Sequence, residues 1–191
     1  MILFLVSLII CILLHELAHL LVAKKCKCGV EVFSVGFGRA IIKKKIGETI
    51  YQLSWLWLGG YCKLAGELIN SKNKTDFSNL SYRKKLYIII AGCVINIITG
   101  LIALVLGAKL LNYSLVYFGL LSIVLGASNL LPIPALDGGY IVYLPLCTRI
   151  WGKEKGYEIF AKITHIGFII IMTLNILCIP YLIHMIKLGR L

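Results

Sequence analysis

The sequence predicts an α-helical polytopic membrane protein with about four transmembrane helices and a small membrane-associated β-hairpin sheet between the first and the second. Of the 191 residues, 60% are hydrophobic and 15% are charged, whereas a soluble domain is about half apolar and about a quarter charged. Mean hydropathy is +0.93, and the apolar residues form long blocks without charge. We expect residues 1–191 to form a single membrane-embedded unit.

Four apolar blocks are long enough to span a membrane, because about 20 helical residues cross a hydrocarbon layer of about 30 Å. These blocks cover approximately residues 2–23, 86–108, 113–131 and 164–186. No basic residue precedes the first block, and a charged motif lies inside it. We therefore interpret the first block as a retained helix and not as a cleavable signal peptide.

The basic residues are distributed unevenly along the chain. Twenty Lys and Arg against eight Asp and Glu give a formal charge of +12, and thirteen of the twenty lie between Lys24 and Lys85. The positive-inside rule then predicts that this segment is cytosolic and that the N-terminus is outside. The aromatic residues Trp55, Trp57 and Tyr61 lie among Leu and Gly without alternating with Arg. We expect the lipid bilayer as a partner and no nucleic acid.

The segment from about residue 29 to residue 67 has a different pattern. Glycines separate short runs of β-prone residues, which predicts hairpin strands. The stretch Trp55–Tyr61 is too apolar for a cytosolic loop and too short to cross the bilayer. We therefore expect a re-entrant or interfacial sheet that packs against the helices.

A short charged motif lies within the first span, where residues 15–19 read HELAH. The spacing of four residues places His15 and His19 on one helix face with their Cβ atoms about 6 Å apart, which suits one Zn²⁺ ion. Glu16 lies beside them and could take a proton from water at the metal. Ionisable groups inside a span are costly and usually functional. The alternative is a helix whose polar side chains are satisfied within the bundle.

Catalytic zinc takes three protein ligands and a water molecule, so a third ligand is needed. Asp137 is the only charged residue from position 110 to position 148. Two prolines interrupt the helical pattern before it and two glycines follow it. A carboxylate in such apolar surroundings needs a cation. We interpret the other acidic residues of polar or basic segments as solvated charges: Glu31, Glu48, Glu67, Asp76, Glu154 and Glu158.

Together, the HELAH motif and the segment 129–139, NLLPIPALDGG, resemble the site-2 protease family of intramembrane zinc metalloproteases. Residues 58–64, LGGYCKL, resemble the LGGYVKM stretch of the regulator-cleaving bacterial branch. Residues 35–38, VGFG, and 91–96, AGCVIN, are further similarities. The family usually has proline at the position of Cys93, and this difference leaves Asn96 in place. The resemblance covers nearly the whole chain.

The resemblance implies that His15, His19 and Asp137 are zinc ligands and that Glu16 is the general base. It also implies that Asn96 holds the substrate backbone or stabilises the oxyanion. Ordinary hydrogen bonding between helices is the alternative for Asn96. We further expect Gly59 and Gly60 of the LGGYCKL stretch to bind substrate.

The function implied is that of a zinc metalloendopeptidase acting on transmembrane segments of membrane-bound regulators or on signal-peptide remnants. The expected location is the bacterial cell membrane, with the active site towards the cytosolic side. The expected partner is a transmembrane protein substrate, and a regulatory membrane partner is left open. Many relatives carry a PDZ domain or a nucleotide-sensing domain, and we expect regulation here without either.

Two other classes of function use the same residues. A membrane metal carrier would employ the histidines and Asp137 for transit, and an inactive relative would act as a binding scaffold. The position of Glu16 beside the candidate ligands favours the enzyme, because a carrier needs ligands but no base next to the water.

Overall fold

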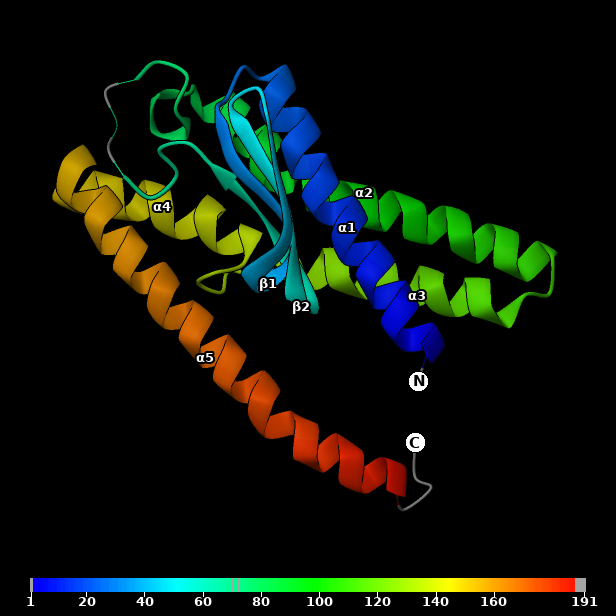
Figure 1. The fold of residues 1–191 in the computed structure, drawn as a ribbon. Coiled ribbons are helices and arrows are strands. Elements are labelled where there is room, and N and C mark those ends of the chain that lie inside the picture. The colour runs from blue at the N-terminus through cyan, green and yellow to red at the C-terminus, as the bar shows by residue number, and fades with distance from the viewer. Residues whose placement is uncertain (1, 70, 72, 188–191) are drawn as a thin grey trace.

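The computed structural model describes residues 2–69, 71 and 73–187. In this part of the chain, five α-helices, one 3₁₀ turn and two β-strands follow one another (Figure 1). They are α1 (Ile2–Lys25), β1 (Val30–Ile46), β2 (Thr49–Leu64), η1 (Phe77–Asn79), α2 (Tyr82–Lys109), α3 (Tyr113–Asn129), α4 (Asp137–Trp151) and α5 (Lys153–Lys187).

Three helical stretches of the described chain are long and apolar enough to cross a membrane: Leu3–Lys25, Tyr82–Lys109 and Lys153–Leu174. The predicted spans 2–23 and 86–108 lie within α1 and α2, and the predicted span 164–186 lies within α5. The predicted span 113–131 corresponds to α3, an apolar helix of only 17 residues. The count of four spans therefore stays a prediction.

The β region extends over almost the whole predicted segment. β1 and β2 are antiparallel, and both are bent. Ser34 of β1 pairs with Gln52 and also with Tyr61, while Gln52 pairs on its other side with Lys43. The first part of β1 consequently lies between the two halves of β2. Gly36, with φ of 91°, supplies a backbone conformation that this bend requires.

The helices pack around this sheet and around one another. α2 and α3 form an antiparallel hairpin, and α1 contacts α2, α3 and both strands. Figure 1 shows α1 crossing this hairpin, while α5 extends away from it at its C-terminal half. The close approach of α2 and α3 depends on Gly100, where an added Cβ would lie 2.7 Å from the carbonyl oxygen of Gly119. The contacts between α1 and α2 place the C-terminal half of α1 beside the first turns of α2.

One helix had no counterpart in the sequence analysis. Residues 132–163 lie between the third and fourth predicted spans and were assigned no element, but they contain α4 and the beginning of α5. Pro145 lies inside α4, and glycines occupy its first turn, so helical propensity is poor at both places. Contacts with α2 and α5 stabilise the helix nevertheless. α4 therefore begins at Asp137 and directs that side chain towards α1.

Candidate metal centre

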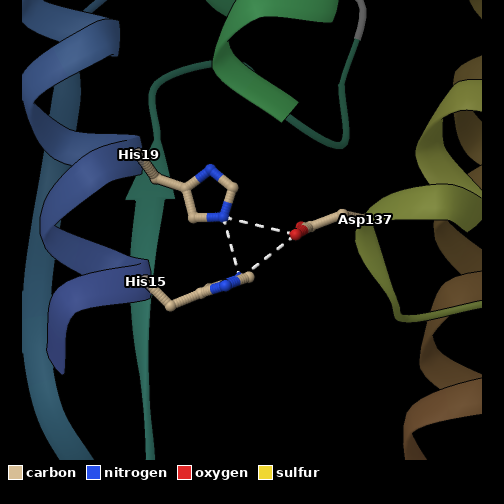
Figure 2. Close-up of side chains that lie close together, drawn as sticks. All are labelled: His15, His19 and Asp137. Carbon is tan, nitrogen blue, oxygen red and sulfur yellow. Dashed lines mark hydrogen bonds and ion pairs between the residues drawn. The ribbon is translucent and has the colours of Figure 1, made fainter. Parts of the chain in front are cut away.

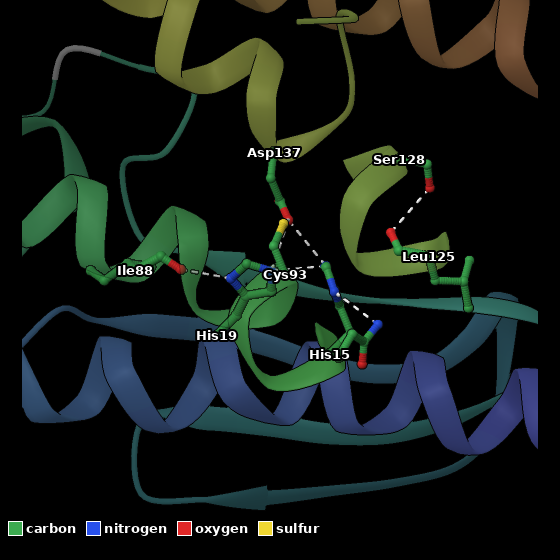
Figure 3. Close-up of polar contacts among 8 residues, drawn as sticks. His15, His19, Ile88, Cys93, Leu125, Ser128 and Asp137 are labelled. Atoms are coloured by element: carbon green, nitrogen blue, oxygen red, sulfur yellow. Dashed lines mark hydrogen bonds and ion pairs between the residues drawn. The ribbon is translucent and has the colours of Figure 1, made fainter. Parts of the chain in front are cut away.

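His15 and His19 lie on the same face of α1, as the spacing predicts, and both are buried, with exposed fractions of 6% and 8%. Their Nε2 atoms are 3.1 Å apart. Nδ1 of His19 lies 2.7 Å from the backbone carbonyl oxygen of Ile88 on α2 (Figure 3). Because a carbonyl oxygen can only accept, this contact places the imidazole proton on Nδ1 and leaves Nε2 available for a metal.

Asp137 meets the two histidines from the opposite wall (Figure 2). Its Oδ2 atom is 3.1 Å from Nε2 of His15 and 3.4 Å from Nε2 of His19. Ligand atoms at about 2.0–2.1 Å from a tetrahedral zinc ion are separated by roughly 3.4 Å. The three separations are close to this value, and the three side chains offer one ligand atom each. The donor set therefore fits a zinc ion.

The approach of α2 to this cluster depends on a glycine that the sequence analysis did not single out. A Cβ atom added to Gly92 would lie 2.5 Å from Nε2 of His19 and 2.6 Å from Nδ1 of His15. Any other residue would push α2 and the imidazoles apart. The AGCVIN motif includes this residue, but only the packing of α2 on α1 shows its role.

Cys93, the next residue on α2, is fully buried. Its Sγ donates to Oδ2 of Asp137 at 3.3 Å (Figure 3). The thiol thus contacts the same carboxylate oxygen that faces the two histidines. The residue that departs from the usual family pattern lies against the cluster and supplies it with a weak donor.

Glu16 and the cluster share one cavity of about 580 Å³. The Cys62 backbone is a hydrogen-bond partner of the Glu16 carboxylate. An added Cβ on Gly60 would lie 3.3 Å from Cγ of Glu16, so β2 runs directly beside this side chain. Gly59 also lines the cavity, and a Cβ there would overlap the ring of Phe37. The structure therefore places both glycines next to the candidate base.

Asn96 lies one helical turn beyond Gly92 and lines the same cavity. Its side chain is 1% exposed. The amide Nδ2 is 3.5 Å from Nδ1 of His15, at the limit of a hydrogen bond, and Oδ1 is buried without a partner among the described residues. A buried polar atom without a partner is unusual in a native structure, which indicates that this amide has a role beyond packing between helices.

One interpretation from the sequence is wrong. Glu67 was taken as a solvated charge, but its carboxylate lines the cavity and accepts a hydrogen bond from the Leu64 backbone N–H at 3.2 Å. The hydroxyl of Tyr140, one turn after Asp137 on α4, is its second partner. Burial raises the pKa of Glu67 to about 7. The sequence contained no signal for this, because the residue follows a turn in a polar segment.

Comparisons with known proteins all match peptidases. The family model of peptidase family M50 matches residues 3–116 and 108–174. A protein of Borreliella burgdorferi, named as a candidate zinc metalloprotease, is 44% identical over 104 residues, which are 49% of this chain and 24% of that relative. A similarly named protein of Campylobacter jejuni is 44% identical over 92 residues, 46% of this chain and 25% of the relative.

A third such relative, from Chlamydia pneumoniae, is 35% identical over 121 residues, 55% of this chain and 20% of the relative. The chain thus matches a quarter or less of the length of these curated relatives.

Proposed function

The chain belongs to peptidase family M50, the site-2 proteases, and we propose that it is an intramembrane zinc metalloprotease. The observation that carries the proposal is the convergence of His15, His19 and Asp137 beside Glu16 in one cavity. The apolar helices that surround the cavity are long enough to lie in a bilayer. Family membership confirms the resemblance seen in the sequence.

In this proposal His15, His19 and Asp137 hold the zinc ion. Zinc in such a site lowers the pKa of water towards 7 and polarises the peptide carbonyl. Glu16 follows His15 directly on α1 and lines the cavity, so its carboxylate is placed to take the proton from the attacking water and to pass it to the leaving amine. A hydrogen bond with the Cys62 backbone fixes the position of the Glu16 carboxylate in the cavity.

Asn96 has a role that the geometry of His15 supports. When His15 binds a metal through Nε2, its Nδ1 carries the proton and requires an acceptor. A half-turn of the Asn96 amide places Oδ1, which is otherwise buried without a partner, next to that donor. Nδ2 is then free to donate to the developing oxyanion of the substrate. The Asn96 side chain would thus orient the zinc ligand His15 and also stabilise the transition state.

The sheet suggests how a substrate is held. Tyr61 and Cys62 pair with β1 on one side only, and both line the cavity together with Gly59 and Gly60. We propose that a substrate segment unwinds and is added along this edge as a further strand. Two consecutive glycines leave room for its backbone near Glu16. Transmembrane segments of membrane-bound regulators and signal-peptide remnants are the proposed substrates.

We also propose a location, the bacterial cell membrane with the site opening towards the cytosol. Residues 24–85 contain most of the basic residues, and they connect to the same ends of α1 and α2 at which the metal centre lies. The N-terminus and the turn between α2 and α3 would then face outside.

The test separates catalysis from metal binding. Purified wild-type protein and Glu16→Gln are incubated with a panel of single-span membrane substrates, and zinc is measured in both. We expect Glu16→Gln to keep its zinc and to lose at least about a hundredfold in cleavage, the usual contribution of a general base. Glu158→Gln, which removes an exposed carboxylate, is the matched control. Cleavage by Glu16→Gln at the wild-type rate would contradict the assignment of the base.

A further inference from the structure

A second pocket, of about 260 Å³, lies between α2, α4 and α5. It is separated from the metal centre by Ile89 and Tyr140, which line both cavities. Most of its wall is apolar, and the residues that form this part are Leu86, Ile89, Ile141, Leu144 and Pro145. Two lysines, Lys85 of α2 and Lys153 of α5, also line it. The pocket thus joins an apolar groove to a pair of positive charges.

Both ammonium groups donate hydrogen bonds to one short segment. Lys85 Nζ donates to the backbone oxygen of Ser78 at 2.9 Å, and Lys153 Nζ donates to Oδ1 of Asn79 at 2.8 Å. Ser78 and Asn79 are adjacent residues of η1. Lys85 also donates to the hydroxyl of Tyr157 at 2.9 Å. Two like charges are therefore fixed at one site, although they repel each other.

The partners of both lysines are neutral. In the described part of the chain, no carboxylate lies within 4.0 Å of either Nζ atom. Each ammonium has three N–H donors, of which Lys85 uses two and Lys153 uses one. Donors remain on both side chains for an anion between them. The rings of Phe77 and Tyr157, each with its centroid 5.6 Å from Lys85 Nζ, offset part of the cost of this half-buried charge. An anion between the two lysines would also remove their mutual repulsion.

The surroundings identify the source of that anion. The pocket lies at the N-terminal end of the candidate span Tyr82–Lys109. Tyr82, which lines it, and Trp151, at the end of α4, are exposed by 61% and 44%. Exposed Tyr and Trp at the ends of spanning helices are typical of the membrane–water interface. An anion at this level with an apolar groove next to it fits a lipid phosphate better than a free one.

We propose that this pocket binds one anionic phospholipid of the bilayer, with its phosphate between Lys85 and Lys153 and an acyl chain along the groove of α2 and α4. The proposal requires only that the helices lie in a membrane. It does not depend on the identity of the metal or on the reaction.

The experiment measures lipid binding to the full chain in detergent. The probe is phosphatidylglycerol with a fluorescent acyl chain, and phosphatidylcholine with the same label is the comparison. We expect saturable binding of one phosphatidylglycerol per chain. Phosphatidylcholine has the same phosphate, but its choline cation would lie near the two ammonium groups, so we expect it to bind about tenfold more weakly. Millimolar inorganic phosphate should not displace the labelled lipid, because it gains nothing from the groove.

Variants test the two lysines. Lys153→Gln should weaken phosphatidylglycerol binding about tenfold, and Lys155→Gln, an exposed lysine outside the pocket, should leave it unchanged. In a second matched pair, Lys85→Gln should weaken binding in the same way, and Lys84→Gln, outside the pocket, should leave it unchanged. Lys153 is exposed, and among the described residues its side chain forms one hydrogen bond, to Asn79, so we expect its variant to keep the fold, which equal melting midpoints in detergent would verify.

Three results would overturn the proposal. Phosphatidylcholine binding as tightly as phosphatidylglycerol would show that the lysines do not select charge. Equal losses in Lys153→Gln and Lys155→Gln would show that the general positive charge of the protein attracts the lipid and that the pocket is not a defined site. Displacement of the lipid by inorganic phosphate at comparable concentrations would assign the pocket to a free anion.

Discussion

Gly92 and His19 are in such close contact that a single added carbon would overlap the imidazole: a Cβ at position 92 would lie 2.5 Å from Nε2 of His19. This relationship predicts that Gly92→Ala displaces one or both histidines. Disturbing the orientation of metal ligands typically lowers metal affinity by about 10–100-fold. Zinc titration of purified Gly92→Ala should show a loss in this range.

The matched control is Gly100→Ala, two turns further along α2. There the added Cβ would meet Ile123 and the backbone of Gly119 on α3, away from the histidines. We expect this variant to melt at a lower temperature and to keep the zinc affinity of the wild type. If both variants lost zinc equally, the effect of Gly92→Ala would reflect general helix packing and not contact with the ligands.

Metal content gives the second prediction. Purified protein should hold about one zinc ion per chain, and Asp137→Ala should lose most of it because only two ligands remain. Cys93→Ala should retain the metal, since the thiol only donates to Oδ2 of Asp137 and that bond is worth about 1 kcal/mol. Elemental analysis of the three proteins provides the measurement. Full zinc in Asp137→Ala would mean that another residue is the third ligand.

The sequence predicted those parts of the site that depend on local spacing. His15 and His19 are one helical turn apart, so their shared face follows from helix geometry alone. Asp137 stood out because no other charge surrounds it in the sequence. Gly92 could not be identified in this way, because its importance arises from contact with His19 and His15, which lie 73 and 77 residues earlier in the chain.

The same distinction applies to the fold. The first three apolar blocks and the glycine-punctuated β region were predicted within a few residues, whereas α5 begins at Lys153, well before the predicted span 164–186. α4 was not, because Pro145 and the glycines of its first turn argue against a helix locally and packing on α2 and α5 overrides them. The double pairing of β1 also depends on a bend that periodicity does not show. Glu67 was misjudged because it lines a cavity formed by several elements, and its partner Tyr140 belongs to α4, a helix that the sequence did not predict.

Glu67 leads to a pH prediction for the zinc-free protein. Its ordinary pKa of 4.5 is raised to about 7 in the folded chain by burial. Between these values the unfolded chain releases a proton that the folded chain keeps, so stability falls as pH rises from about 4.5 to about 7. The titratable groups that interact with Glu67 are its hydrogen-bond partner Tyr140 and, through charge, His19, Glu16, Cys28, Cys62 and Lys63.

Glu67→Gln should remove this decline and should melt several degrees above the wild type at pH 8, as about 1 kcal/mol corresponds to about 2–4 °C in a chain of this size. Melting midpoints in detergent from pH 5 to pH 8, with a chelator present, provide the measurement. Glu31→Gln, which removes an exposed carboxylate paired with Lys63, should keep the wild-type pH dependence. A Glu67→Gln profile parallel to that of the wild type would show that Glu67 is not the group responsible.

The last prediction concerns the side of the membrane. His19 of α1 contacts the carbonyl of Ile88 on α2, and His15, one turn earlier on α1, lies beside Asn96, two turns later on α2. The two helices therefore run in opposite directions past the metal centre. The turn after α2 is therefore expected at the level of the N-terminus of α1. Single cysteines replace two exposed residues, Lys74 and Leu110, in a background without the seven native cysteines.

With residues 24–85 in the cytosol, an impermeant thiol reagent should label the cysteine at position 74 only in inverted vesicles or permeabilised cells. The cysteine at position 110, where the native leucine is 69% exposed, should be labelled in intact cells. Leu110 is preferred to Asn112 because the Asn112 side chain accepts a hydrogen bond from the Leu115 backbone and caps α3. The opposite pattern of labelling would reverse the orientation, and the site would then open away from the cytosol.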